Sequence, residues 1–375
     1  MLNLEAADEH LAVSEVARAI GLDLLSPAAR AAEATRRVPG PIWKTLLETG
    51  LVAPVPEERG GSGLPDTLTH LLAIENFAYG DPGIALASAW SGAAAFLLGR
   101  HGSPAQDELL ARLIGDAEAR GSVALYEGFG RCPAEYRTEV TVTGDQVRVS
   151  GHKVAVPFVG QAPEIIVIGM DSAVGGLRAV VVPAATPGVQ LDRSSGHLAL
   201  DATGIGAVSF DVTVPVSQLV GGPGADPHAL AGSVERIRLI VAAAQTGVAQ
   251  RAVDYAAAYA TERVAFGRPI AGFQGVSFPL AEAHTRIAEL RLELGSAASR
   301  LDGEPSGSTA EVSAAVTRLL GYAAEVATEA TRSALQTLGG HGFITDHPVE
   351  LWYRAAAALA ALDVDPAQSA FHAAL

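Results

Sequence analysis

Residues 261–283, TERVAFGRPIAGFQGVSFPLAEA, place a cation, a turn and an amide close together in the sequence. Arg263 stands three residues before the Phe266-Gly267 pair, and Gln274 follows seven residues after that glycine. The chain has a formal net charge of −15, and the field of such a chain repels nucleic acid and anionic membrane surfaces. An anionic ligand must therefore be bound by individual arginines. Taken alone, Arg263 is more simply a cation at the C-terminus of a helix.

A second glycine-rich stretch, LQTLGGHGFITDHPVE at residues 335–350, contains further polar candidates. His341, Asp346 and His347 could suggest a metal site, but no third-ligand pattern accompanies them, so we favour a polar surface turn. In isolation, Gly339 and Gly340 would be interpreted as a plain turn between two helices.

These candidates belong to helical sequence that flanks a β-rich middle. Ala, Leu and Glu dominate from Glu5 to about Gly115, with apolar residues recurring at three and four and breaks at Pro and Gly clusters. Helical patterns return after the linker GGPGADPHA. There we expect three long helices and a shorter one in an up-and-down bundle, at Ala231–Arg263, Phe278–Leu301, Ser308–Leu338 and about Pro348–Leu362.

Residues between about Ser122 and Pro215 alternate with period two, which predicts strands. In TEVTVTGDQVRVSG the pattern places Val140 and Val142 opposite Val149 and Val147 across a Gly-Asp turn. The predicted fold class is therefore α+β and multidomain. We expect an N-terminal helical domain at residues 1–120, a middle β domain at 121–220 and a C-terminal four-helix bundle at 228–375.

The bulk composition is that of a soluble globular protein, since 49 % of the 375 residues are apolar and 18 % are charged. Residues 82–99 have nearly the length of a membrane span but are rich in Ala, Ser and Gly, so we expect a buried helix. The acidic N-terminus lacks the basic region of a signal peptide. The single cysteine, Cys132, excludes an internal disulfide, fits a reducing compartment and has no histidine nearby in sequence, so we do not favour it as a nucleophile. We expect a cytoplasmic protein.

The order of helices, sheet and helices, with TERVAFGRPIAGFQGVSFPLAEA and LQTLGGHGFITDHPVELWYRAA at their observed separation, resembles the acyl-CoA dehydrogenase family of flavoproteins. GLVAPVPEERGGSG, GDPGIALA and GVAQRAVDYAAAYATERVAFGRPI match further family segments, so the resemblance covers nearly the whole chain. The resemblance implies FAD as the cofactor. It also implies an oligomer, either a homotetramer or a heterotetramer with a homologous subunit.

Both opening stretches receive roles from this resemblance. Arg263 matches the arginine that binds the FAD pyrophosphate, Phe266 a phenylalanine packed near the cofactor, and Gln274 a glutamine along its adenosine half. The second FAD segment of the family, which reaches the cofactor of a neighbouring subunit, matches Gln336, Gly339 and Gly340. Dimerisation would then be part of the cofactor site.

The family reaction removes an α proton from an acyl thioester with a carboxylate, while the β hydrogen leaves as hydride to the flavin. Counting from Arg354, which matches an arginine of the last short helix, the base position falls on Asp363. Asp363 is one methylene shorter than the family's glutamate and lacks the Gly-Thr that follows it, and a displacement of about 1 Å can cost about a hundredfold in rate. An ordinary polar residue at a helix end is an equally good interpretation.

Some family branches carry the base on the central helix, where this chain has Ile237, which cannot act. Glu235 lies two residues earlier, about 200° around the helix, so we expect it to point away from that site. Arg238 matches a family arginine near the substrate pocket and could orient the base or meet the anionic ligand. A surface ion pair with Glu235 is the simpler alternative.

The middle domain departs from the family pattern. Where the family commonly has Thr-Glu-Pro-Gly-Ala-Gly-Ser-Asp, this chain has YEGFGRCP at residues 126–133. Where the family's Trp-Ile-Thr stacks on and hydrogen-bonds the flavin ring, this chain has Ala155 and Pro157 at the Trp and Thr positions. Alanine has no stacking face and proline has no donor. The residues for the nucleotide half of FAD are therefore retained, while those for its ring are replaced.

Three functions remain open from the sequence. The first is an autonomous FAD-dependent dehydrogenase of an acyl-CoA or carrier-bound acyl thioester, with electron-transfer flavoprotein as the acceptor that the resemblance implies. The second is a catalytically incomplete subunit of a heterotetrameric acyl-CoA dehydrogenase, which supplies FAD half-sites to a partner as in the bacterial steroid side-chain enzymes it resembles. The third is a non-catalytic or different-chemistry flavin-binding homologue. The sequence does not specify the acyl group.

Overall fold

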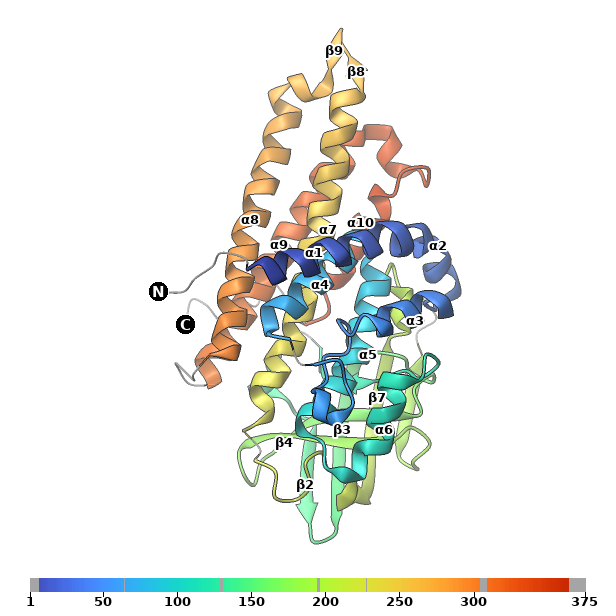
Figure 1. Cartoon of the computed structure of the whole chain (residues 1–375), viewed down its shortest axis with the longest axis vertical. Helices are drawn as coiled ribbons and strands as arrows, with labels where there is room; N and C mark the ends of the chain where they lie inside the picture. Colours follow the sequence, from blue (N-terminus) through green and yellow to red (C-terminus); the bar gives the residue numbers. More distant parts are fainter. Residues whose placement is uncertain are drawn as a thin grey trace.

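The computed structural model describes residues 7–63, 65–128, 131–193, 196–226, 228–303 and 309–363. A helical N-terminal region leads into a sheet, and the chain returns to long helices (Figure 1). This order and the α+β fold class confirm the prediction from the sequence. The exact domain limits at 1–120, 121–220 and 228–375 stay a prediction.

The N-terminal region is built from short helices around one long buried helix. Its elements are α1 Asp8–Ile20, a π-helical turn Gly21–Leu25, α2 Ser26–Thr35, α3 Gly40–Glu48, α4 Thr67–Gly80, α5 Pro82–His101 and α6 Asp107–Gly115. Asp81 caps α5 by accepting a hydrogen bond from the Ile84 N–H at 2.7 Å, and Pro82 occupies the first helical position. Among the described helices, α5 alone is long and apolar enough to cross a membrane, and its apolar window is entirely buried inside the protein.

The middle region is one curled sheet with its own apolar core. Its strands are β1 Val123–Ala124, β2 Glu139–Thr143, β3 Gln146–Val156, β4 Glu164–Asp171, β5 Gly176–Pro183, β6 Val189–Arg193 and β7 Gly206–Pro215. They pair in the order β1-β4-β2-β3-β7-β6, and β5 pairs with β4. Val140 lies opposite Val149, and Val142 opposite Val147, so the register predicted for this hairpin is confirmed. The alternating valines of these strands form the core inside the sheet.

The ladder between β3 and β7 is interrupted by a bulge between Lys153 and Val156. Ala155 within it has a φ of 49°, and Phe158 just after β3 has a φ of 55°. Left-handed backbone at residues that are not glycine is strained and is concentrated at functional sites. The strained bulge therefore makes this end of β3 a candidate part of a functional site.

The C-terminal region contains the bundle, made of α7 Leu230–Glu262, α8 Gln274–Asp302, α9 Thr309–Leu338 and α10 Val349–Ala360. Helix α8 begins four residues before the expected Phe278, because the helix accommodates Pro279 in its second turn rather than beginning just before it. The first two-thirds of α7 are buried on all sides against α4, α8, α9 and α10. This helix is the centre of the main core.

The connection between α7 and α8 projects from the body as a small hairpin of β8 Val264–Ala265 and β9 Arg268–Pro269. It lies at the top of Figure 1, at the opposite end of the molecule from the sheet. Phe266 and Gly267 have φ values of 53° and 81°, as the two central residues of a type I′ turn require. The Phe266 side chain is 95 % exposed.

Candidate functional site

The residues matched to the nucleotide half of FAD lie at the exposed end of the bundle. The side chains of Arg263, Phe266 and Gln274 are exposed on or beside the projecting hairpin. Gln336 lies in the last turn of α9, and Gly339, which has a φ of 57°, follows that helix directly with Gly340. A groove of about 370 Å³ runs between the start of α8 and the end of α9 and is lined by Gly275, Val276, Pro279, Arg332, Ser333, Gln336 and Thr337. The fold therefore brings the two predicted FAD segments to one end of the molecule.

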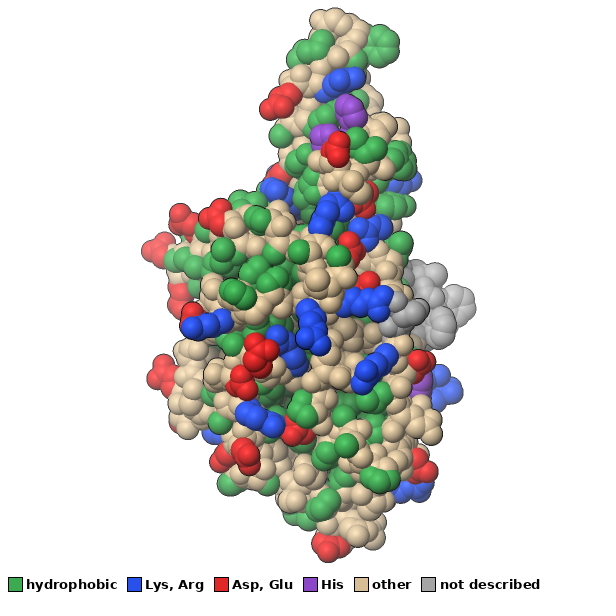
Figure 2. All heavy atoms as spheres, turned by 90° about the vertical axis from the view of Figure 1, so that its right-hand side faces the viewer, with side chains coloured by type: hydrophobic (Ala, Val, Ile, Leu, Met, Phe, Trp, Pro, Cys, Tyr) green, Lys and Arg blue, Asp and Glu red, His purple; other side chains and the backbone are tan. Residues whose placement is uncertain are grey.

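Apolar side chains gather at this end, where Figure 2 shows hydrophobic atoms on the narrow tip. Val264 is 59 % exposed and Phe278 is 61 % exposed, in addition to Phe266. The Phe273 ring contacts Phe266 edge-on at 6.1 Å, and the Arg268 guanidinium lies 4.1 Å from its centroid. An exposed apolar group of this kind marks an interaction site.

A buried charge cluster lies where α7 meets the chain after α10. The Arg238 side chain is fully buried, and its Nη2 and Nε donate to Asp363 Oδ1 and Oδ2 at 2.9 and 3.0 Å. Its Nη1 donates to Glu235 Oε2 at 2.8 Å. The ion pair between Arg238 and Glu235 is thus present but buried, so its expected surface location was wrong. The reason is tertiary: α9 and the chain after α10 cover this face of α7.

Burial and charge act in opposite directions in this cluster. Burial raises the pKa of Glu235, although the Arg238 guanidinium opposes the shift. Burial alone would lower the pKa of Arg238, but Asp363 and Glu235 outweigh it and raise that pKa well above its ordinary value. The structure therefore brings Asp363 and Glu235 to the same guanidinium, that of Arg238, a grouping that helical angles alone did not predict.

Glu235 also lies on the wall of a cavity of about 230 Å³ between the sheet and the bundle, which we call the α7 cavity. Its other lining residues are Pro133, Ala134, Met170, Gly175, Gly176, Leu177, His228, Ala231, Ala310 and Ser313. Apolar side chains predominate among them. Among these lining residues, Glu235 is the one carboxylate.

Two tyrosines beside the charge cluster were missed by the sequence analysis. Tyr126 and Tyr136 are 5 % and 6 % exposed, and neither hydroxyl has a hydrogen-bond partner among the described residues. Burial keeps the pKa of both phenols well above its ordinary value, and the charges of Asp363 and Arg238 act on both. Both hydroxyls are therefore protonated and available as hydrogen-bond donors. The only sequence signal was tyrosine at the first position of YEGFGRCP, where the family has threonine.

A second buried ion pair holds this segment against the bulge of β3. Lys153 Nζ is fully buried and donates to Glu127 Oε1 and to the Leu125 carbonyl, both at 2.9 Å. Glu127 also accepts from the backbone N–H groups of Arg137 and Thr138 at 2.6 and 2.9 Å. Burial lowers the pKa of Lys153 to about 8. Glu127 keeps the family's glutamate in the motif that corresponds to YEGFGRCP, and this match is the sequence signal that could have identified it.

Burial also raises the pKa of the nearby Cys132 thiol, which disfavours the nucleophilic thiolate.

The bulge itself forms one wall of a larger cavity of about 750 Å³, which we call the sheet–α10 cavity. Ala155 lies in this wall, beside Val154. The opposite wall is the end of α10, with Leu362 directly before Asp363. The remaining lining residues are Asp192, Arg193, His197, Leu198, Ala199, Leu200, Ile205, Gly206, Ala207, Ala358 and Ala361. The lining is mostly apolar, and Leu362 connects it along the chain to Asp363 of the buried charge cluster.

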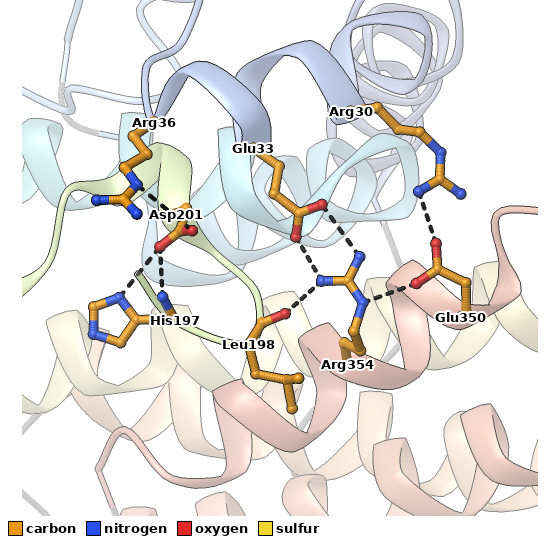
Figure 3. Close-up of polar contacts among 8 residues, drawn as sticks. All are labelled: Arg30, Glu33, Arg36, His197, Leu198, Asp201, Glu350 and Arg354. Carbon is orange, nitrogen blue, oxygen red and sulfur yellow. Dashed lines mark hydrogen bonds and ion pairs between the residues drawn. The ribbon is translucent and has the colours of Figure 1, made fainter. Parts of the chain in front are cut away.

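Arg354 of α10 contacts the lining of this cavity at the Leu198 carbonyl (Figure 3). It forms a two-pronged ion pair with Glu33 of α2, donates to Glu350 at 2.8 Å and to the Leu198 carbonyl. Arg30 pairs with Glu350 at 2.7 Å. Three regions of the chain, α2, α10 and the loop between β6 and β7, are thereby joined at one point.

Within the described ranges, no group of three or more metal-binding side chains is found. His341 and His347 instead stack on each other with centroids 5.5 Å apart. Each Nδ1 lies 2.8 Å from a tyrosine hydroxyl of α7, that of Tyr259 or Tyr255.

Comparison with known proteins agrees with this architecture at both ends of the chain. Residues 7–115 match the family model for the acyl-CoA dehydrogenase N-terminal domain, and residues 228–363 match that for the C-terminal domain. A probable acyl-CoA dehydrogenase of Bacillus subtilis is 30 % identical over 366 residues, covering 94 % of this chain and 93 % of that protein. A mitochondrial short-chain specific acyl-CoA dehydrogenase of Bos taurus is 29 % identical, covering 94 % and 86 %.

Solved structures extend the same comparison to the whole fold. Butyryl-CoA dehydrogenase from Megasphaera elsdenii superposes with a TM-score of 0.81 at 25 % identity, and the match covers 100 % of both chains. A glutaryl-CoA dehydrogenase from Mycobacterium smegmatis in complex with FADH2 has a TM-score of 0.82 at 20 % identity, covering 98 % and 95 %. With both terminal domains matched and a relative aligned along nearly its full length, this chain belongs to the acyl-CoA dehydrogenase family of oxidoreductases.

Proposed function

We propose that this chain is a cytoplasmic, FAD-dependent oxidoreductase that introduces a double bond between the α and β carbons of an acyl-CoA or carrier-bound acyl thioester. The observation that carries the proposal is the position of Asp363, which directly follows Leu362 in the wall of the sheet–α10 cavity and is held by the buried Arg238. An apolar cavity that adjoins a fixed carboxylate is what α-proton abstraction requires, because the base must be desolvated and held in place.

The residues present fit FAD. The sheet–α10 cavity is lined at the bulge of β3 by Val154 and Ala155, and the small Ala155 side chain leaves room there for a planar ring. Arg263 is exposed at the tip, where its guanidinium can pair with a diphosphate. Because the tip lies at the opposite end of the molecule from the sheet, a cofactor that contacts both would lie between two subunits. We therefore propose that Arg263, Phe266, Gln274, Gln336, Gly339 and Gly340 serve a neighbouring subunit's site.

When bound, FAD supplies the acceptor for the hydride that leaves the β carbon. In this proposal Asp363 takes the α proton as that C–H bond breaks, and the electron pair forms the new double bond. Arg238 acts through Asp363 as a positioning residue, since it holds both carboxylate oxygens. This arrangement limits Asp363 as a base, because both of its carboxylate oxygens already accept hydrogen bonds from Arg238. We assign the acyl group to the apolar α7 cavity, because Glu235 of the same charge cluster lies in its wall, and electron-transfer flavoprotein takes the electrons onward.

A heteromeric subunit is the second candidate, and Ala155 is the observation that favours it. The side chain at the ring-stacking position is a methyl group in strained backbone, so this cavity lacks the aromatic face that the family uses. In this alternative the chain lends the residues of its tip to a homologous partner whose own sheet and base complete the site. A flavoprotein of different chemistry remains the third possibility that the sequence left open.

The deciding experiment measures flavin per chain and anaerobic bleaching of the flavin by a series of acyl-CoA thioesters. Wild-type protein and an Asp363→Asn variant are compared, with Asp211→Asn on the exposed face of the sheet as the matched control. Bleaching that is lost in Asp363→Asn with flavin retained supports the proposal. Bleaching that survives removes Asp363 as the base. Protein that gains flavin only with a co-expressed homologue favours the heteromer.

A further inference from the structure

The sheet–α10 cavity presents one imidazole, that of His197, in the loop between β6 and β7. Its Nδ1 lies 3.3 Å from Asp201 Oδ1, and its backbone N–H donates to the same oxygen at 2.9 Å (Figure 3). The other polar lining residues of this cavity are Asp192 and Arg193. No motif in the sequence drew attention to this histidine.

The contact with Asp201 decides which nitrogen of His197 is available. An ionised carboxylate only accepts hydrogen bonds, so Nδ1 carries a hydrogen and Nε2 is left for other partners. In Figure 3 the second ring nitrogen is directed away from Asp201. The His197 side chain is 33 % exposed, as expected for a group on a cavity wall.

Neighbouring elements contact residues 196–205, the described part of the loop that carries this pair. Asp201 is 15 % exposed and lies 3.9 Å from the Arg36 guanidinium at the end of α2. The carbonyl of Leu198 accepts from Arg354 of α10. Leu200, with a φ of 67°, leads into a 3-10 turn at Asp201–Thr203. Contacts from α2 and α10 thus hold Asp201 and the Leu198 backbone, and Asp201 in turn orients the imidazole for a hydrogen bond to a ligand.

We propose that His197, oriented by Asp201, contacts the isoalloxazine ring of FAD in the sheet–α10 cavity. This inference rests on the proposed function, because it takes that cavity as the site of the ring. The imidazole supplies the aromatic face that Ala155 in the bulge does not offer and the donor that Pro157, just after β3, lacks. Neutral Nε2 accepts from a ring N–H, and a protonated Nε2 donates to a ring carbonyl or nitrogen. Asp201 is the positioning residue.

The first test is a titration of the deflavinated full-length protein with FAD, followed by flavin fluorescence and visible absorption. His197→Ala should weaken FAD binding by about tenfold, the effect of one lost hydrogen bond together with ring contact. His197→Gln, whose amide nitrogen reaches the place of Nε2, should recover most of the affinity, while His197→Asn should not. His152→Ala is the matched control, because His152 is an exposed histidine of β3 that bonds Ser209 Oγ.

ADP titrations separate ring contact from loop damage. ADP reports on the nucleotide half alone, so its affinity should be unchanged in His197→Ala. A parallel loss of ADP and FAD affinity in His197→Ala would make His197 a purely structural residue and would overturn the proposal. Unchanged FAD affinity with an unchanged spectrum would also overturn it.

The same measurements distinguish failure of this inference from failure of the proposed function. If wild-type protein binds FAD through His197 but acyl-CoA does not bleach the flavin, the proposed function fails alone. If FAD binds independently of His197 and bleaching proceeds, this inference fails alone. If the wild-type protein binds no FAD, both fail for this chain by itself.

Nitrogen NMR of histidine-labelled protein gives a readout that needs no turnover. Without FAD, His197 should have a protonated Nδ1, and Asp201→Asn should change that tautomer population. Saturation with FAD should shift the Nε2 resonance of His197 and leave that of His152 in place. An Nε2 resonance that does not move at full flavin occupancy would refute the contact.

Discussion

Replacing Arg238 with methionine tests how the buried charge cluster contributes to this protein. Arg238 is fully buried and lies 2.8 Å from Glu235 and 2.9 Å from Asp363. Methionine keeps an unbranched apolar stem but removes the guanidinium, so two carboxylates remain buried without a cation. Removal of one partner from a buried ion pair costs about 3–5 kcal/mol. We expect a loss of that size in the free energy of unfolding at pH 8.

The corresponding change in melting temperature follows from the size of the chain. An unfolding entropy of about 2.1 cal/mol/K per residue gives about 0.8 kcal/mol/K for 375 residues, so Tm should fall by about 4–6 °C. The deficit should shrink on acidification. Burial already raises the pKa of Glu235, and without Arg238 the native state takes up protons more readily than the unfolded state, so falling pH stabilises it. Calorimetry at pH 8 and pH 5.5 measures both effects.

Two further variants make the result decisive. Adding Glu235→Gln and Asp363→Asn to Arg238→Met removes the buried charges and should restore most of the stability. Arg148→Met is the control, because its ion pair with Asp211 is exposed and should contribute less than about 1 kcal/mol. The reasoning is wrong if Arg238→Met melts within about 1 °C of wild type at pH 8, or if neutralising both carboxylates restores nothing.

Three other outcomes follow from the structure. Burial raises the pKa of Asp81 from 3.8 to about 6, so the free energy of unfolding should fall as pH rises through this interval. Asp81→Asn keeps the helix cap but removes the charge. Urea unfolding should therefore give this variant a free energy of unfolding up to about 3 kcal/mol higher than wild type above pH 6, and the same value below pH 4. Burial lowers the pKa of His70 to about 3, so stability that is present above pH 6.5 should be lost on acidification. In thermal scans, the melting temperature of His70→Phe should therefore fall less steeply below pH 6.5 than that of wild type. An equally steep fall in both proteins would contradict this reasoning. Phe266→Ser removes an exposed apolar anchor and should raise the subunit dissociation constant at least about tenfold in sedimentation measurements, with the fold unaltered by circular dichroism.

Most of the architecture was predictable because periodicity is a local property. Apolar spacing of three and four gave the helices of both terminal regions, and period-two alternation gave the strands, down to the pairing of Val140 with Val149. The start of α8 was missed because a proline near a helix start is ambiguous from sequence. Whether residues 82–99 span a membrane or fill a core is also decided by what surrounds them, and the described structure buries that helix completely.

The candidate site also has features that depend on residue type alone and features that depend on the fold. The sequence by itself determined the family, the residues of the projecting tip and the loss of aromatic and donor groups at Ala155 and Pro157, because each depends on residue type at a matched position. The sequence named Asp363 and Glu235 as alternative partners of Arg238, and only the tertiary structure decided that Arg238 contacts both of them inside the protein. It also decided that His197 with Asp201 lines the cavity beside Ala155. The physical reason is that a buried charge needs a partner of opposite charge, and only the fold decides which residue supplies it. The partner of Arg238 is Asp363, which lies 125 residues away along the chain.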